Sequence, residues 1–395
     1  MNEILQRDMK ILVAMITSEI TSREDKKAKW AQFKKDHREE LRVILGLPDR
    51  EDVNPGTLMG FDIDEENQHI LLNYSSEAHN VLHEIPGGWS PQLRQMRGLV
   101  YSYEEPGNAA SVKLISRGFE KFFNANELPE NTYDALRKNH GNGKFLARYK
   151  ADGHMIEYFV DKGKLFATTR GKLGTASAVE ALTMFDIDEF NSINSHFGNE
   201  LMSLIVELVT PNTEVHVDYE GEENLYLLAA YDKHGNKLSL EQLEYIANEC
   251  SNKFTIPFAK EFTLDEMIAE INDRSVQNNE GWVMDFDGEL IKFKYISYIG
   301  KMVESKLSYK YIMNCIRNDR LDKMLFTLPE EIRSHAYLMV DVIDSVVATA
   351  SSYKPLYDLY TEREGGESYF RTVCRAFWKE KATKSTSQIL KWKAA

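Results

Sequence analysis

The stretch RYKADGHMI, residues 148–156, places one lysine two residues before an aspartate and a glycine. The segments 144–150 and 154–160 on its two sides are typical of strands, and 165–170 completes a hairpin after the turn DKGK. A lysine in a half-buried strand costs free energy unless a partner or ligand uses its charge. Lys150 is therefore a candidate nucleophile, and a solvated surface lysine is the alternative.

Composition limits the class of protein. The chain has 395 residues, of which 43% are hydrophobic and 28% charged, as in a globular protein of two or three domains. It contains no apolar run of about 18 residues, so we expect no transmembrane helix and no membrane partner. The three cysteines are scattered, which predicts a reducing compartment, a cytoplasmic location and no zinc site. Because the net charge is −14, a surface that binds nucleic acid must gather its Lys and Arg locally.

The periodicity of the chain changes twice. Residues 1–45 show helical spacing, strands dominate from about 58 to 300, and helical stripes return after 300. The pattern predicts an α+β fold in which antiparallel sheets with flanking helices are followed by an all-helical C-terminal domain. We place the borders at 1–60 for an N-terminal helical extension, 61–300 for the central domain and 301–395 for the helical domain.

Two further segments carry candidate site residues. In LIKFKY, residues 290–295, the period of two puts Lys292 and Lys294 on one face of a strand. Neighbouring ammonium groups repel, so they favour an anion such as a polyphosphate between them; a solvent-facing strand edge is the alternative. Glu280 begins the same hairpin, and Glu207 lies inside the apolar run LMSLIVELV, where a carboxylate needs a cation or a ribose hydroxyl.

Several motifs follow one another in a fixed order, and together they resemble the covalent nucleotidyltransferase superfamily and, more closely, the phage RNA ligase 1 family. They are RGLVY from Arg97, SRGFEKFFNANE with Lys121, KADG from Lys150, VELVTPNTEVHVDY with Glu207, EGWV from Glu280, and KFK with Lys292 and Lys294. The resemblance covers about residues 80–300. One block departs from the family pattern, because Asn212 and Thr213 are exchanged and Glu214 stands where the family has arginine.

The resemblance implies a role for each residue. Lys150 would attack the α-phosphorus of ATP and carry AMP as a lysyl phosphoramidate, for which its amine must be neutral; burial and nearby cations would disfavour the charged form. The remaining implied roles are triphosphate contacts for Lys292, Lys294, Lys121 and Arg97, a ribose or metal-water contact for Glu207, a metal contact for Glu280, shaping of the turn by Asp152 and Gly153, a ribose-side contact for Arg170, and reading of the adenine by backbone groups around Tyr149.

The implied activity is ATP-dependent RNA ligation. AMP would pass from the lysine to an RNA 5′-phosphate, and an RNA 3′-hydroxyl would then displace AMP. The expected cofactors are ATP and Mg²⁺ or Mn²⁺, and the expected substrate is single-stranded RNA or a nicked tRNA loop, in RNA repair. The family suggests a phage as the source, in which case the cytoplasm is that of the host, and we expect a monomer.

Other functions stay open at this point. A DNA ligase or an mRNA guanylyltransferase would usually continue with a β-barrel after the last motif, and residues 300–395 show helical stripes instead. A catalytically silent RNA-binding protein is the alternative from another class. Basic and aromatic residues interleave over 371–393, which indicates either an RNA contact or a helix that docks on the acidic body.

Overall fold

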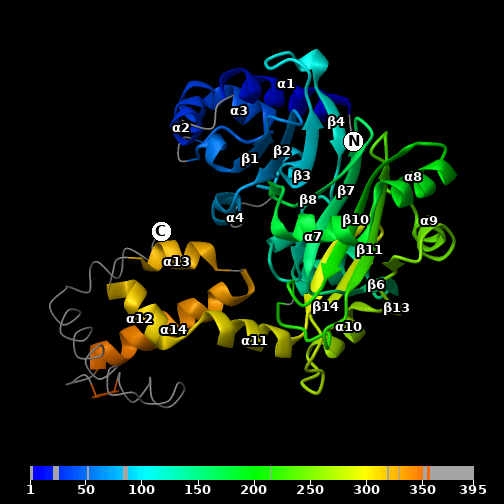
Figure 1. Cartoon of the computed structure of the whole chain (residues 1–395). Coiled ribbons are helices and arrows are strands. Elements are labelled where there is room, and N and C mark those ends of the chain that lie inside the picture. Colours follow the sequence, from blue (N-terminus) through cyan, green and yellow to red (C-terminus); the bar gives the residue numbers. More distant parts are fainter. Residues whose placement is uncertain are drawn as a thin grey trace. The chain divides into compact units, whose positions relative to one another are not determined.

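The protein is described by a computed structural model (Figure 1), which describes residues 3–20, 26–50, 53–82, 88–213, 215–317, 320–328, 330–349 and 354–355. The basic stretch 371–393 and Glu214 lie outside these residues. The chain divides into two compact units, Met1–Tyr295 and Ile296–Ala395. Within the described part of the chain, no helix combines the length and the apolar character needed to cross a bilayer.

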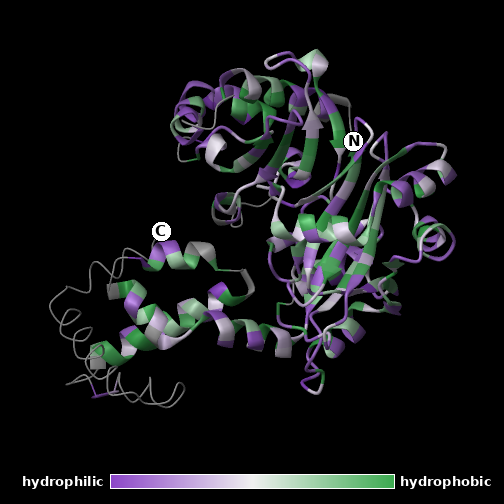
Figure 2. Cartoon of the chain, viewed as in Figure 1, coloured by the Kyte–Doolittle hydropathy of each residue, from purple (hydrophilic) through white to green (hydrophobic). Residues whose placement is uncertain are grey.

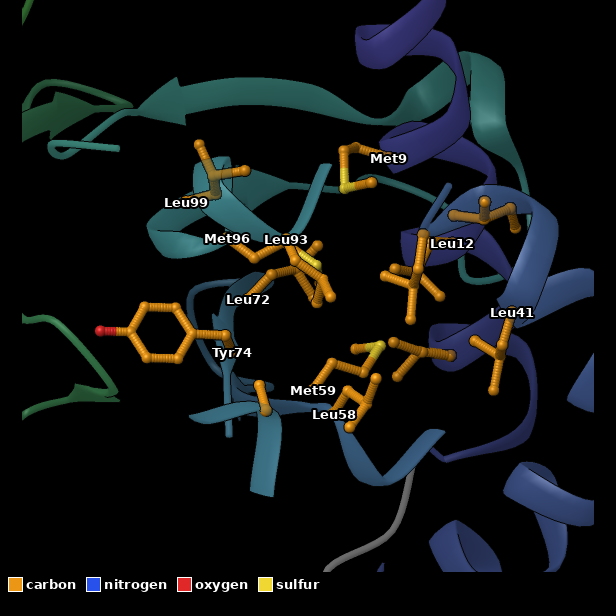
Figure 3. Close-up of a cluster of buried hydrophobic side chains, with 14 of the residues drawn as sticks. Met9, Leu12, Leu41, Leu58, Met59, Leu72, Tyr74, Leu93, Met96 and Leu99 are labelled. Carbon is orange, nitrogen blue, oxygen red and sulfur yellow. The ribbon is translucent and has the colours of Figure 1, made fainter. Parts of the chain in front are cut away.

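The first unit contains three sheets, and the first of them has the strand order β1-β2-β3-β4 with antiparallel neighbours throughout. Its strands are β1 (Met59–Asp64), β2 (His69–Tyr74), β3 (Arg97–Ser102) and β4 (Lys113–Ser116). Helices α1 (Glu3–Glu19), α2 (Lys26–Asp36) and α3 (Arg38–Ile44) share one buried cluster with this sheet. Figure 3 shows Met9, Leu12 and Leu41 from the helices close to side chains of the sheet. The predicted domain border at residue 60 stays a prediction, and residues on both sides of it belong to this shared core.

The second sheet has the order β12-β11-β10-β7-β8-β9. Its strands are β7 (His154–Asp161), β8 (Lys164–Thr169), β9 (Lys172–Leu173), β10 (Leu201–Val209), β11 (Asn224–Asp232) and β12 (Phe254–Thr255). β10 is the central strand, with antiparallel partners β7 and β11, and eight of its nine residues are buried. Its continuous apolar sequence is the pattern expected of a strand that is covered on both faces.

The third sheet has the order β13-β6-β14-β15-β5. Its strands are β5 (Phe123–Asn124), β6 (Phe145–Lys150), β13 (Ala259–Phe262), β14 (Gly281–Phe286) and β15 (Glu289–Lys294). All neighbours are antiparallel except β15 and β5. This sheet brings the strand that ends in Lys150 next to the hairpin that begins after Glu280.

Helices flank the sheets of the first unit, and several begin at residues with a capping side chain. Thr263 accepts a hydrogen bond from the backbone of Glu266, whose carboxylate accepts one from Thr263, and Ser239 and Gln242 form the same reciprocal pair. These helices are α4 (Ser76–Leu82), α5 (Pro91–Gln95), α6 (Tyr133–His140), α7 (Ala176–Met184), α8 (Ile187–His196), α9 (Leu240–Tyr245) and α10 (Leu264–Ile271).

The described part of the second unit is helical. Its helices are α11 (Ile296–Lys306), α12 (Tyr309–Arg317), α13 (Leu321–Thr327) and α14 (Glu330–Thr349). Hydrophobic and hydrophilic residues alternate along them in Figure 2, and the buried residues Ile332, Ala336 and Ile343 follow the helical period in α14. The predicted α+β fold, antiparallel sheets with flanking helices followed by helices, is confirmed.

Candidate active site

Strand register places two lysines on either side of one glycine. Gly281 at the start of β14 lies opposite Lys150 on β6 and opposite Lys294 on β15. Gly281 has φ +150°, and a Cβ at this position would clash with the backbone of Phe293 and Lys294. A glycine is therefore required where the three strands meet, and the residues that face each other across it are the two lysines.

One carboxylate joins these lysines. The Nζ of Lys150 lies 2.6 Å from Oε2 of Glu280, and the Nζ of Lys294 lies 3.1 Å from Oε1 of the same residue. Glu280 is 3% exposed, so both of its oxygens are used inside the protein. A buried carboxylate between two ammonium groups satisfies charges that would otherwise be costly to remove from water.

Lys150 faces a cavity of about 240 Å³ that is lined by residues of the second and third sheets and of the 97–122 region. Of the predicted site residues, the cavity is lined by Arg97, Tyr149, Lys150, Glu207, Lys292 and Lys294. The exposed fraction of the Lys150 side chain is 21%, so this lysine is neither fully buried nor directed into open water. The remaining walls are largely apolar, as is usual for small-molecule sites.

Two cations of the cavity share an aromatic neighbour. The Arg97 guanidinium lies 5.5 Å from the ring centroid of Phe122, and the Nζ of Lys292 lies 4.8 Å from it. Burial lowers the pKa of Lys292 to about 7, and the positive charges of Lys121, Arg97 and Lys294 act in the same direction. An anion that entered the cavity would find these cations close together.

Glu207 lines the cavity from β10 of the second sheet, where it pairs with Met155 of β7. Burial raises the pKa of Glu207 to about 7, while the charge of Lys150 and a hydrogen bond from the backbone of Gly153 oppose this shift. Gly153 lies so close to β10 that a Cβ would clash with the backbone of Leu208. Gly153, the last residue of the KADG motif, therefore lets this turn approach β10 and Glu207.

Asp152 holds a neighbouring segment in place. Its Oδ2 accepts hydrogen bonds from the backbone N–H groups of His216 and Val217, at 2.9 Å and 3.0 Å, and its own N–H donates to the Tyr219 hydroxyl at 2.8 Å. The hydroxyl of Tyr149 lies 3.3 Å from that of Tyr219. In this arrangement the Asp152 carboxylate fastens residues 216–219 to the turn that follows Lys150.

Lys121 and Arg170 are not among the described residues that line the Lys150 cavity. The Nζ of Lys121 lies 3.5 Å from Glu127 and 4.5 Å from the ring centroid of Phe123, and this lysine lines a neighbouring cavity of about 270 Å³. Arg170 donates to the hydroxyl of Tyr74 at 2.8 Å. Their predicted contacts with the nucleotide stay predictions.

Sequence reasoning missed three charged residues of the cavity: Arg148, Lys237 and Asp285. The signal for Arg148 was present, because the period of two that places Lys292 beside Lys294 also places Arg148 beside Lys150. Asp285 lies four residues after Gly281 on the same face of β14. Lys237 follows β11 and has no comparable pattern.

Glu280 and Glu207 are the two carboxylates of the site that could bind a metal ion. No group of three or more His, Cys, Asp and Glu suited to a metal ion occurs in the part of the chain that the structure describes. Glu280 and Glu207 do interact, because the charge of Glu280 raises the pKa of Glu207. Two carboxylates fit Mg²⁺, which retains several water ligands and is usually bound by one or two protein carboxylates.

The model of a family described as RNA ligase matches residues 95–308, which is more than half of the sequence and includes every candidate residue above. The chain belongs to this RNA ligase family. The resemblance to the phage RNA ligase 1 family is thereby confirmed.

Curated relatives of this RNA ligase are distant. A protein of Thermovibrio ammonificans named as a candidate RNA ligase is 24% identical over 320 residues, which are 75% of this chain and 77% of the relative. A protein of Autographa californica nuclear polyhedrosis virus named as a candidate bifunctional polynucleotide kinase/RNA ligase is 24% identical over 241 residues, 55% of this chain and 31% of the relative.

Similar solved structures include an archaeal ATP-dependent RNA ligase, form 1, with 16% identity, a TM-score of 0.45, and coverage of 79% of this chain and 82% of that one. A Naegleria gruberi RNA ligase mutant solved with AMP and Mn has 18% identity, a TM-score of 0.36, and coverage of 47% of this chain and 58% of that one. These likenesses are too distant to equate individual residues.

Proposed function

We propose that this RNA ligase uses ATP and joins an RNA 5′-phosphate to an RNA 3′-hydroxyl through a nucleotide carried on Lys150. The observation that carries the proposal is the position of Lys150 in a cavity with Lys294 across Gly281 and with Glu280 bonded to both lysines. Five further cations, Arg97, Arg148, Lys237, Lys292 and Lys294, line the same cavity, and the carboxylate of Glu280 lies at hydrogen-bond distance from Lys150, which supports a role for Lys150 as the nucleophile.

In the first step the neutral amine of Lys150 attacks the α-phosphorus of ATP. A P–N bond forms and the P–O bond to pyrophosphate breaks, with the electron pair leaving on pyrophosphate. Glu280 is the group at hydrogen-bond distance that can accept the proton of Lys150, at 2.6 Å. Lys294, Lys292 and Arg97 stabilise the charge that develops on the phosphates.

In the second step an oxygen of the RNA 5′-phosphate attacks the phosphorus of the lysyl-AMP. The P–N bond breaks, its electron pair goes to the Lys150 nitrogen, which takes back the proton held by Glu280, and RNA carrying a 5′–5′ pyrophosphate leaves the lysine. In the third step an RNA 3′-hydroxyl attacks the 5′-phosphorus of that RNA, its proton passes to solvent, and AMP departs with the pyrophosphate oxygen. The strand is then continuous.

Glu280 and Glu207 are the residues that would hold Mg²⁺ or Mn²⁺, which when bound would supply positive charge to the phosphates. Occupation of Glu280 by a cation would also remove the partner that holds the ammonium form of Lys150. The physiological substrate that we propose is a single-stranded RNA end or a nicked tRNA loop, in a repair reaction of a phage-infected cell, with the protein acting as a monomer in the host cytoplasm.

The test is incubation with α-labelled ATP and Mg²⁺ or Mn²⁺, followed by a denaturing gel. We expect label on the wild type and on Lys144→Ala, which removes an exposed lysine before β6, and no label on Lys150→Ala. Label on the Lys150→Ala chain would exclude this nucleophile. A preference for labelled GTP would favour the guanylyltransferase alternative, and absence of label from every chain would favour a silent RNA-binding protein.

Ligation is tested with a 5′-phosphorylated single-stranded RNA and with a tRNA cut in its anticodon loop. We expect circles from the first and a restored strand from the second, each dependent on Lys150. A DNA ligase would seal a nicked DNA duplex in preference to either RNA.

A further inference from the structure

The cavity face of the third sheet is built in successive rows. The first row contains Lys150, Gly281 and Lys294, and the second contains Arg148, Val283 and Lys292. Asp285 begins the next row, two residues further along β14 and opposite Leu290. Since a strand rises about 3.4 Å per residue, Asp285 lies roughly 13 Å along the strand from the lysine row. The cavity therefore continues away from Lys150 toward a second set of charges.

Arg148 has few partners for a half-buried arginine. Its one hydrogen bond among the described residues runs from Nη1 to the carbonyl oxygen of Leu228 and is 3.5 Å long. Burial lowers the pKa of Arg148, while the charge of Asp285 opposes this shift. Most of the guanidinium donors are thus left for a ligand in the cavity that Arg148 lines.

Asp285 supplies an acceptor close to these donors. Its Oδ1 accepts a hydrogen bond from the backbone N–H of Gly288 at 2.6 Å, which fixes the carboxylate, and Oδ2 has no partner among the described residues. The charge of Asp285 acts on both Arg148 and Lys237. A donor and an acceptor therefore meet at this part of the cavity.

Apart from the cation Lys237, the walls around these two groups are mostly apolar, with Leu146, Leu228, Val283, Leu290 and the ring of Phe119 lining the same cavity. A flat heteroaromatic ring fits between such walls, whereas the carboxylate of Asp285 would repel a phosphate at this position. In adenine, the acceptor N7 lies next to the donor amino group N6; in guanine, the same edge offers two acceptors, N7 and O6.

We propose that Arg148 and Asp285 read the base of the nucleotide that Lys150 takes up, with Arg148 donating to N7 of adenine and Asp285 accepting from its N6 amino group. This inference rests on the proposed adenylyl transfer. Guanine would place O6 against the carboxylate of Asp285, so the pair selects ATP over GTP.

The experiment measures kcat/KM for formation of the lysyl nucleotide with ATP, 7-deaza-ATP, which lacks N7, and purine riboside triphosphate, which lacks the amino group. The proteins are the wild type, Arg148→Met, Asp285→Asn and the control Arg137→Met, whose arginine lies on α6 and pairs with Asp134 and Asp265. A hydrogen bond with a charged partner changes such a constant by roughly 10-fold or more.

We expect the wild type and Arg137→Met to prefer ATP over each analogue by roughly 10-fold or more. Arg148→Met should use ATP and 7-deaza-ATP equally, and Asp285→Asn should lose most of its preference against purine riboside triphosphate. Equal use of ATP and 7-deaza-ATP by the wild type, or an unchanged ratio in Arg148→Met, would overturn the proposal. The wild-type ratios decide the matter even if a variant fails to fold.

The same measurements separate base recognition from two other results, phosphate binding by Arg148 and failure of the proposed adenylyl transfer. If Arg148→Met leaves the analogue ratios unchanged and weakens inhibition by pyrophosphate, Arg148 binds phosphate and does not read the base. If the wild type forms no nucleotide adduct on Lys150 with any of the three compounds, the proposed function fails before the base contact is tested.

Discussion

Lys150 and Lys294 lie on either side of Gly281 and donate to the two oxygens of a single carboxylate, that of Glu280. The relationship is set by strand register, because Gly281 pairs with Lys150 on β6 and with Lys294 on β15. Any group that binds Glu280 therefore changes the surroundings of both lysines at once. The two amines are one electrostatic unit, although 143 intervening residues separate them in the sequence.

Gly281→Ala should destabilise the protein and abolish adenylyl transfer. The added Cβ would meet the backbone of Phe293 and Lys294 at a φ of +150°, so β14 and β15 would have to separate at the lysine pair. We expect a loss of roughly 1–3 kcal/mol or more in the free energy of unfolding, measured by urea denaturation.

Gly163→Ala is the matched control for this substitution. Gly163 also has positive φ, +73°, but no atom lies within 4 Å of the position of its Cβ. Gly163→Ala should lower the free energy of unfolding only by the roughly 1–2 kcal/mol expected for a left-handed backbone conformation, and adenylyl transfer should persist. Equal losses of stability and activity in the two variants would contradict the packing argument.

The sequence pattern predicted the central strands well, because these strands are long, nearly uninterrupted runs of apolar residues. LMSLIVELV and NLYLLAAYD coincide with β10 and β11 from end to end. The sequence also predicted which residues share a face of a strand. The period of two places Lys292 and Lys294 on the same face, and both line the cavity.

The sequence did not reveal which strands become neighbours. β6 and β14 are separated by more than 120 residues, and a period of two defines a face but not a partner strand. Nor could it show that the Asp152 carboxylate would be occupied by the backbone of His216 and Val217, or that Lys121 would pair with Glu127. These contacts depend on tertiary packing of segments with no shared pattern.

Glu280→Gln should slow formation of the lysyl adenylate. The amide cannot carry the negative charge that joins the two ammonium groups, and it is a poorer ligand for Mg²⁺. We expect the initial rate of labelling to fall by at least roughly 10- to 100-fold, as is usual when a group around a bound metal is lost. The Mg²⁺ requirement should also rise. The readout is the initial rate of labelling as a function of Mg²⁺ concentration.

Glu289→Gln changes an exposed carboxylate on β15 of the same hairpin and should leave both quantities unchanged. An unaltered Mg²⁺ requirement in Glu280→Gln would show that this residue does not contact the metal.

Glu157 should make the stability of the protein depend on pH. Its side chain is 0% exposed, Ser116 donates to Oε2 at 2.9 Å, and Oε1 has no hydrogen-bond partner in the described structure. Burial raises the pKa of Glu157 from its ordinary value near 4.5 to about 8. Between these values the native state retains a proton that the unfolded state releases, so the free energy of unfolding falls as pH rises.

Glu157→Gln should remove this contribution, which amounts to at most about 1.4 kcal/mol per pH unit. Urea denaturation from pH 5 to pH 8 measures the slope, and the exposed Glu261→Gln serves as the control. Part of the remaining slope should come from Glu207, whose pKa is about 7. A slope in Glu157→Gln equal to that of the wild type would show that Glu157 is ionised in the native protein.

Lys292 should take up a proton when ATP binds. Burial and neighbouring cations lower the pKa of Lys292 to about 7, so at pH 8 this amine is mostly neutral before binding. Phosphates in the cavity would favour its charged form and raise the pKa again. Calorimetric titration of Lys150→Ala with ATP, in metal-free buffers of different ionisation enthalpy, should show proton uptake at pH 8 and less uptake at pH 6. Lys292→Met in the same background should bind without this uptake, and the exposed Lys144→Met should retain it. An equal uptake in all three proteins would assign the proton to another group and would remove the evidence that Lys292 meets the phosphates.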